Sequence, residues 1–175
     1  MIRILALADT HIEREPLPDA LAGLARGADI ILHAGDFVSC SAYEAVEALG
    51  SLEAVQGNAD TTRLVKALPE RRTLEVEGIR IGLVHRAGPG ILGAMMMARE
   101  MDVQVLVFGH IHRPIVERGE RLLISPGSPT APRMAPPSVA ELSIHDGCVR
   151  GRIIQLGPPT CDYLRYAGSL MVDRE

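Results

Sequence analysis

The sequence has few aromatic residues, and this scarcity limits what the protein can bind. Aromatic residues make up 3% of the 175 residues, and tryptophan is absent. Surfaces that hold single-stranded nucleic acid usually stack the bases on aromatic side chains, so such a surface is not expected here. The same scarcity means that the core must be aliphatic, and a hydrophobic share of 47% is enough to build one and to argue against disorder.

Cysteine and long apolar runs are scarce as well. Cys40, Cys148 and Cys161 are widely spaced and form no C-x-x-C pair, so they indicate neither a disulfide framework nor a zinc knuckle. Reduced thiols in a cytosolic protein are the simplest interpretation. No apolar run reaches the ~20 residues of a membrane span, and the first residues lack the basic flank and cleavage site of a signal peptide. We therefore expect a cytoplasmic protein without a membrane partner.

Basic residues do not gather into a run or stripe. The chain has 18 lysines and arginines against 22 acidic residues, which gives a net charge of −4 with neutral histidines. Proteins that bind extended nucleic acid usually carry a basic surface. An extended nucleic acid is therefore not an expected partner, although a short oligonucleotide or a cyclic nucleotide remains compatible with the sequence.

The order of apolar segments predicts a single α/β domain over residues 1–175. The first half alternates strands and helices, which favours parallel pairing, and the second half carries hairpin signals at Glu77-Gly78 and Asp146-Gly147. We expect two mixed sheets packed face to face with helices outside, followed by a tail over 157–175 with a helix at 163–170. The expected strands are 2–8, 30–33, 52–56, 72–76, 79–85, 103–108, 115–118, 121–125, 139–145 and 148–155. The expected helices are 18–26, 42–49, 61–68 and 91–101.

Polar residues directly follow five of these apolar runs. Ligand sites of α/β proteins gather at the carboxyl ends of strands, and Asp, Asn and His are ligands that suit divalent Mn, Zn, Fe, Ni or Co. Each motif alone is a weak signal, because Gly-Asp and Gly-Asn usually mark turns. Their order and spacing together argue against coincidence. The motifs are Asp9-x-His11, Gly35-Asp36, Gly57-Asn58, His85 and Gly109-His110-x-His112.

In this order the motifs resemble the signature of the calcineurin-like metallophosphoesterases: D-x-H, G-D, G-N, a histidine after a strand, and G-H-x-H. The segment Ser125-Pro126-Gly127-Ser128, followed by Pro132-Arg133, is similar to a loop of their small bacterial and archaeal phosphodiesterase branch. The resemblance extends over about residues 1–154. It implies a four-layer αββα sandwich with a metal site at one edge, at the carboxyl ends of strands.

The resemblance also implies the ligands and the reaction. Manganese is the expected metal, with Ni, Zn, Fe, Co or Mg as alternatives. A water activated between two divalent ions would hydrolyse a phosphate ester; Asp36 would hold that nucleophilic water, and Asn58 is the second residue assigned to catalysis. The implied ligands are Asp9, His11 and His112 for one ion, Asn58, His85 and His110 for the other, and Asp36 as the bridge.

Two positions depart from the family pattern. Ala59 stands where many members carry a histidine after Gly-Asn, and Ala87 stands where the second histidine of His-Gly-His is usual. Loss of the first histidine, which is thought to protonate the leaving group or steady the phosphate, suggests substrates with better leaving groups, diesters, or protonation by metal-bound water. Arg86 could hold a substrate phosphate or could be a surface arginine paired with an acid. Arg133 could reach the site or lie on an exposed structural loop.

The preferred function is therefore a hydrolase acting on phosphodiesters or small phosphomonoesters. The alternative is a scaffold or protein-interaction role, because a eukaryotic relative of this fold is a subunit of a membrane-trafficking coat; the complete ligand set favours the enzyme. The run Met95-Met96-Met97 predicts packing in the core or in a homodimer or homotetramer. Asp60 is expected to cap a short helix rather than to take part in catalysis.

Overall fold

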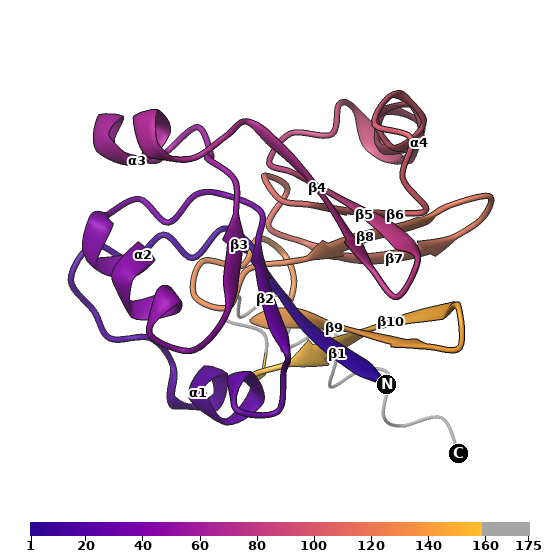
Figure 1. Cartoon of the computed structure of the whole chain (residues 1–175). Coiled ribbons are helices and arrows are strands. Elements are labelled where there is room, and N and C mark those ends of the chain that lie inside the picture. The colour runs from indigo at the N-terminus through magenta and orange to yellow at the C-terminus, as the bar shows by residue number, and fades with distance from the viewer. Residues whose placement is uncertain (159–175) are drawn as a thin grey trace, which may run out of the picture.

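The computed structural model describes residues 1–158, and these form ten strands and four helices (Figure 1). The helix expected at 163–170 and Cys161 lie outside the described residues. The strands are β1 (Ile2–Leu7), β2 (Ile30–His33), β3 (Leu52–Ala54), β4 (Arg71–Val76), β5 (Ile79–Val84), β6 (Val105–Phe108), β7 (Pro114–Arg118), β8 (Leu122–Pro126), β9 (Ser138–His145) and β10 (Cys148–Gln155). The helices are α1 (Asp19–Ala25), α2 (Cys40–Glu47), α3 (Thr62–Ala67) and α4 (Gly90–Glu100).

The strands of the described residues make two mixed sheets of five. The first sheet has the order β10-β9-β1-β2-β3, in which β1, β2 and β3 are parallel and β9 runs antiparallel to β1. The second sheet has the order β4-β5-β6-β8-β7, in which β5, β6 and β8 are parallel and the two edge strands are antiparallel. Hairpins supply the antiparallel edges, as the turn signals Glu77-Gly78 and Asp146-Gly147 predicted.

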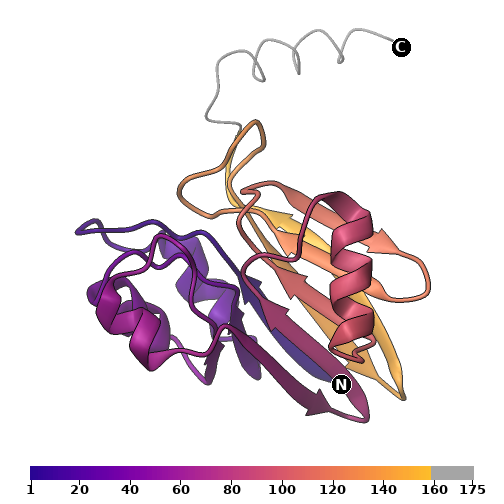
Figure 2. The same cartoon turned by 90° about the horizontal axis from the view of Figure 1, so that it is seen from above.

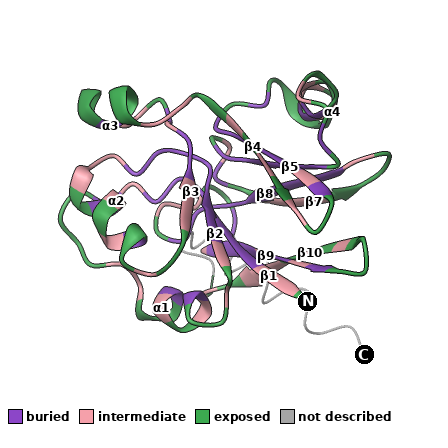
Figure 3. Cartoon of the chain, viewed as in Figure 1, coloured by how far each residue is buried: buried purple, intermediate pink, exposed green. Residues whose placement is uncertain are grey.

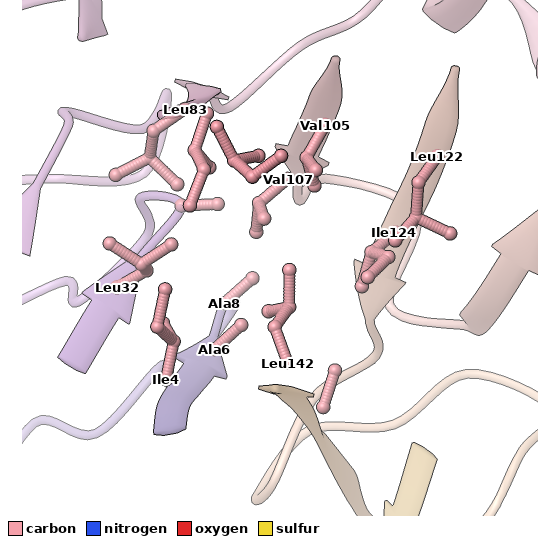
Figure 4. Close-up of a cluster of buried hydrophobic side chains, with 14 of the residues drawn as sticks. Ile4, Ala6, Ala8, Leu32, Leu83, Val105, Val107, Leu122, Ile124 and Leu142 are labelled. Carbon is pink, nitrogen blue, oxygen red and sulfur yellow. The ribbon is translucent and has the colours of Figure 1, made fainter. Parts of the chain in front are cut away.

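Three layers of buried apolar side chains hold the sheets and helices together. The central layer lies between the two sheets, where Ile4, Leu32, Val107 and Leu142 converge from both sides (Figure 4). The outer face of the first sheet packs against α1 and α2, and that of the second sheet packs against α4. Figure 2 shows α4 and the helices α1–α3 on opposite sides of the sheets. This is the four-layer αββα sandwich that was expected.

Burial on both faces explains why the central strands consist of nearly continuous apolar residues. Every residue of β6 is buried, and the interior strands are the most deeply covered parts of the molecule (Figure 3). In β1, Ile4 and Ala6 face the central layer, whereas Leu5 and Leu7 face α1 and α2. The alternation of side chains along a strand therefore divides one apolar run between two cores.

Helix α4 contains the methionine run. Met95 and Met97 pack against the outer core of the second sheet, whereas the Met96 side chain is 63% exposed. Core packing is therefore confirmed for two of the three methionines, and the homo-oligomer expected from this helix stays a prediction. None of the helices within residues 1–158 has the length and apolar character needed to cross a membrane.

Candidate metal centre

The predicted ligands all lie at the carboxyl ends of parallel strands. Pairing of Leu7 with His33 brings β1 and β2 to the same level, so the residues that follow them leave the sheet side by side. Pairing of Val84 with Phe108 does the same for β5 and β6 in the second sheet. Because the two sheets pack face to face, one edge of the sandwich collects loops from both.

The first group of ligands is compact. The ligand atoms of Asp9, His11, Asp36 and His112 all lie within 4.8 Å of one another, and three of the four residues are buried. His112 Nε2 lies 3.6 Å from Asp9 Oδ1, and His11 Nε2 lies 3.3 Å from Asp36 Oδ2. The group combines oxygen and imidazole donors, which suits a divalent transition metal.

The second group adjoins the first through Asp36. His85 Nε2 lies 3.0 Å from Asn58 Oδ1 and 3.3 Å from Asp36 Oδ2. The rings of His85 and His110 meet edge to face, with centroids 5.2 Å apart. The structure therefore brings all seven predicted ligand residues together, with the Asp36 carboxylate next to both groups.

Backbone carbonyls orient two of the imidazoles. His85 Nδ1 lies 2.8 Å from the carbonyl oxygen of Ala34, and His112 Nδ1 lies 2.6 Å from that of Ala131. A carbonyl oxygen can accept but not donate, so Nδ1 carries the hydrogen in both rings. The lone pair is then on Nε2, which faces the acidic residues. This arrangement of a carbonyl, a histidine and an open Nε2 is typical of metal-binding histidines.

Two buried atoms at this edge lack the hydrogen bonds that burial normally requires. Within the described residues, neither Asp9 Oδ2 nor His11 Nε2 makes a hydrogen bond, although His11 Nε2 lies 3.3 Å from the Asp36 carboxylate. A cation placed between them would satisfy both atoms. The residues present therefore fit a divalent metal ion.

The carboxylates respond to burial in different ways. Burial raises the pKa of Asp9 above its ordinary value, despite the neighbouring His112 and His85. Burial also acts to raise the pKa of Asp36, but the imidazoles of His11 and His85 and the N–H of Ala59 outweigh it and lower that pKa. The N–H of Ala59 donates to Asp36 Oδ1 over 2.7 Å. Asp36 is therefore held as a carboxylate, the form that binds metal.

The backbone at the site adopts conformations that side chains usually avoid. Within the described chain, five of the seven predicted ligands have a positive φ, although none of them is glycine. Such conformations cost free energy and cluster at functional sites, where the surrounding structure enforces them. The values of φ are 54° at Asp9, 44° at His11, 63° at Asp36, 73° at His110 and 55° at His112.

Glycines beside the ligands allow the loops to approach one another. A Cβ atom at Gly57 would lie 2.1 Å from Asp36 Oδ1, and one at Gly109 would lie 2.7 Å from the carbonyl oxygen of Ala34. Neither distance is possible in a folded chain. The glycines of Gly-Asn and Gly-His are thus required by close packing at the site as well as by the turns that they mark.

Asp60 has a different role from the one expected. The helix α3 begins after Thr61, so the prediction that Asp60 caps this helix is wrong. Its carboxylate accepts hydrogen bonds from the N–H groups of Val38 (2.8 Å), Gly57 (2.7 Å) and Asp36 (3.3 Å). Asp60 therefore joins the loop that carries Asn58 to the loop that carries Asp36.

Sequence reasoning missed the residues that support the Asp9-Thr10-His11 turn. His33 is buried, and its Nε2 lies 2.6 Å from the Thr10 hydroxyl, while its ring stacks on Phe37. Burial lowers the pKa of His33 to about 3, so the ring is neutral. Ser128, in the segment that resembles the family loop, donates a hydrogen bond of 2.6 Å to the carbonyl oxygen of Asp9. Its place in that segment was the one signal that could have assigned it.

The remaining predicted residues surround the site. Arg86 is exposed, and within the described residues its Nε donates to Asn58 Oδ1 over 3.0 Å rather than to an acid. The backbone N–H of Arg133 donates to the carbonyl oxygen of His112 over 3.2 Å, and Arg133 is exposed. Ala87 is buried in the outer core of the second sheet, so the position of the family's second histidine is apolar here.

Known proteins resemble this chain in sequence and in fold. A relative from Methanothermobacter thermautotrophicus named a probable metallophosphoesterase is 35% identical over 168 residues, which cover 91% of this chain and 96% of the relative. A crystal structure of Vps29 from Entamoeba histolytica complexed with zinc has a TM-score of 0.71 at 23% identity and covers 89% of this chain and all of that chain.

A structure described as a novel archaeal phosphodiesterase has a TM-score of 0.64 at 20% identity, and covers 87% of this chain and all of that chain. At these identities the two solved structures establish the shared fold alone. The family model for the calcineurin-like phosphoesterase superfamily domain matches residues 2–147. With the D-x-H, G-D, G-N and G-H-x-H residues gathered at one edge of an αββα sandwich, the chain belongs to the calcineurin-like phosphoesterase superfamily.

Proposed function

We propose that the protein is a phosphodiesterase that uses two divalent metal ions, with manganese as the activating metal. The observation that carries the proposal is the position of Asp36, whose carboxylate lies next to both groups of ligands. Asp9, His11 and His112 would hold one ion, and Asn58, His85 and His110 the other. When bound, two such ions lower the pKa of water and neutralise charge on phosphate oxygens.

The protein's own residues divide the remaining tasks. Asp36 stays ionised and is fixed by the N–H of Ala59, so its carboxylate is positioned before a substrate arrives. Arg86 uses Nε to orient the Asn58 amide, and its two terminal nitrogens are then the donors offered to a phosphate oxygen. Arg133, on the loop beside His112, is a second candidate for contact with the substrate.

The preference for diesters rests on the residue after Asn58. Ala59 has no proton to donate from its side chain, and its N–H is already used by Asp36. A substrate with a good leaving group needs less help from an acid. Together with the resemblance of residues 125–133 to a loop of the small phosphodiesterase branch, this favours a small phosphodiester as the substrate, rather than an extended nucleic acid or a membrane.

The proposal is tested with metal-stripped protein and a pair of chromogenic substrates, bis(4-nitrophenyl) phosphate and 4-nitrophenyl phosphate. Mn, Ni, Zn and Mg are added singly, and bound metal per chain is measured. We expect two ions per chain and fastest diester hydrolysis with Mn. Asp36→Ala should lower diester hydrolysis by more than about 100-fold, which exceeds the usual effect of changing a residue that only supports a metal ligand.

Asp19→Ala is the matched control, because Asp19 is an exposed aspartate in the first turn of α1 and is not a proposed ligand. It should retain full activity. Two bound ions without turnover of either substrate would contradict the proposal and favour the scaffold alternative. Faster hydrolysis of the monoester would contradict the preference for diesters.

A further inference from the structure

Beside the proposed metal centre is a cavity that the reaction outlined above does not use. It encloses about 390 Å³, within the range of about 300–1,000 Å³ in which small-molecule pockets usually fall. One wall is the loop that follows β5, and the other is the end of β6 with the loop after it. The lining residues are Arg86, Ala87, Gly88, Pro89, Gly90, Phe108, Gly109, His110, Ile111 and Ile115.

The chain builds this cavity with small residues. Strands β5 and β6 are parallel neighbours, and the N–H of Gly109 donates to the carbonyl oxygen of His85, so the two loops leave the sheet together. Gly88 has a φ of 88°, and a Cβ atom at Gly93 would lie 2.7 Å from its carbonyl carbon. The start of α4 therefore packs directly on the loop backbone, and few side chains are left to fill the space.

The cavity borders the proposed metal centre at His110 and is otherwise mostly apolar. His110, a proposed ligand, and Arg86, which contacts Asn58, are the two charged or polar side chains of its lining. The other side chains come from alanine, proline, phenylalanine and isoleucine. A neighbouring cavity of about 280 Å³ also borders Arg86, and beside Gly57 and Val84 its lining holds the polar residues Gln56, Asn58, Glu70, Arg71 and His85. A phosphate at Arg86 would thus border both an apolar cavity and a second, more polar cavity.

We propose that the apolar cavity binds an uncharged apolar substituent of the substrate, alkyl or aryl, while the phosphate lies at the metal centre. The preferred substrates are then phosphodiesters with one apolar ester group, and the polar cavity receives the second, hydrated group. This proposal rests on the proposed function, but it makes a separate claim about which ligands bind.

The test compares two ligands that differ in the apolar group alone, phenylphosphonate and methylphosphonate, by calorimetric titration of the Mn-loaded protein. The matching diesters, phenyl and methyl 4-nitrophenyl phosphate, are compared by kcat/KM. Burial of a phenyl ring removes enough apolar surface from water to predict at least about tenfold tighter binding and faster turnover for the phenyl member of each pair. The binding arm remains informative even if neither diester is hydrolysed, which separates this proposal from the proposed function.

Ile115 is the residue to change, because it lines the cavity from β7 and is not a proposed ligand. Ile115→Glu should reduce the phenyl preference to within about twofold of unity and leave bound Mn unchanged. Ile115→Trp, which fills the space without adding charge, should do the same if the glutamate variant folds poorly. Val65→Glu, at an exposed position on α3, is the control and should keep the preference. Equal binding of the two phosphonates by the unaltered protein, or a preference that survives both Ile115 variants, would overturn the proposal.

Discussion

At the scale of single residues, the site depends on glycines as much as on ligands. Gly57 has no side chain, and a Cβ atom there would lie 2.1 Å from Asp36 Oδ1 and 2.2 Å from the Asp36 nitrogen. We expect Gly57→Ala to push the Asp36 loop away and to weaken Mn binding by at least about tenfold, in the range found when support of a metal ligand is lost. Calorimetric titration with Mn measures the effect.

A control for this change is Gly157→Ala, because among the described residues nothing lies within 4 Å of a Cβ atom at Gly157. That variant should bind Mn like the unaltered protein. If Gly57→Ala bound Mn with unchanged affinity, the Asp36 loop would be able to move without weakening Mn binding. The close contact at Gly57 would then not matter for function.

The proposed ligands form recognisable sequence motifs, whereas Asp60 and His33, which support them, do not. Asp9, Asp36 and His85 directly follow apolar runs, so a short pattern identifies them. Asp60 and His33 act through bonds to Val38 and Thr10, which are 22 and 23 residues away in the chain. No local pattern records such a bond, because it exists only after the strands have paired.

At the scale of elements, Asp60 connects two strand–helix loops, β2–α2 and β3–α3. Asp60→Ala would remove the acceptor of the Val38 and Gly57 N–H groups, and an unsatisfied buried group costs about 1–3 kcal/mol. We expect a loss of roughly 2–5 kcal/mol in the free energy of unfolding, measured by urea denaturation in the presence of a chelator so that metal binding does not contribute.

Asp60→Asn keeps one carbonyl oxygen as an acceptor, so it should lose less stability than Asp60→Ala. If both variants were as stable as the unaltered protein, the loops would be fixed by other contacts and the role assigned to Asp60 would be wrong.

Element type was predicted well where local chemistry decides it. The Glu77-Gly78 and Asp146-Gly147 turns both have positive φ at each residue, and both hairpins lie where these pairs predicted them. Boundaries were less well predicted where tertiary contacts decide them. The strand expected from residue 103 begins at Val105, because the N–H of Val103 bonds back to Ala98 at the end of α4.

At the scale of the whole molecule, the division of apolar runs among three cores could not be read from the runs themselves. Continuous burial in β6 is compatible with several α/β architectures. The order of strands and helices predicted two mixed sheets with helices outside, and the family resemblance added the four-layer arrangement with the metal site at one edge. The four-layer arrangement brings the two sheets together at one edge of the molecule. Asp9, His11, Asp36 and Asn58 follow strands of the first sheet, whereas His85, His110 and His112 follow strands of the second.

Because the ligands come from both sheets, metal binding should stabilise the sandwich as a whole. At a Mn concentration 100 times the dissociation constant, linkage adds about 2.7 kcal/mol to the free energy of unfolding for each ion bound. For a chain of this length each bound ion therefore raises Tm by roughly 5–10 °C, measured by calorimetry before and after removal of metal. Asp36→Ala should lose most of the rise because its carboxylate adjoins both groups, whereas the exposed-site variant Asp19→Ala should keep it. A similar rise in both variants would mean that Mn binds elsewhere, and the edge where the two sheets meet would then not be the metal centre.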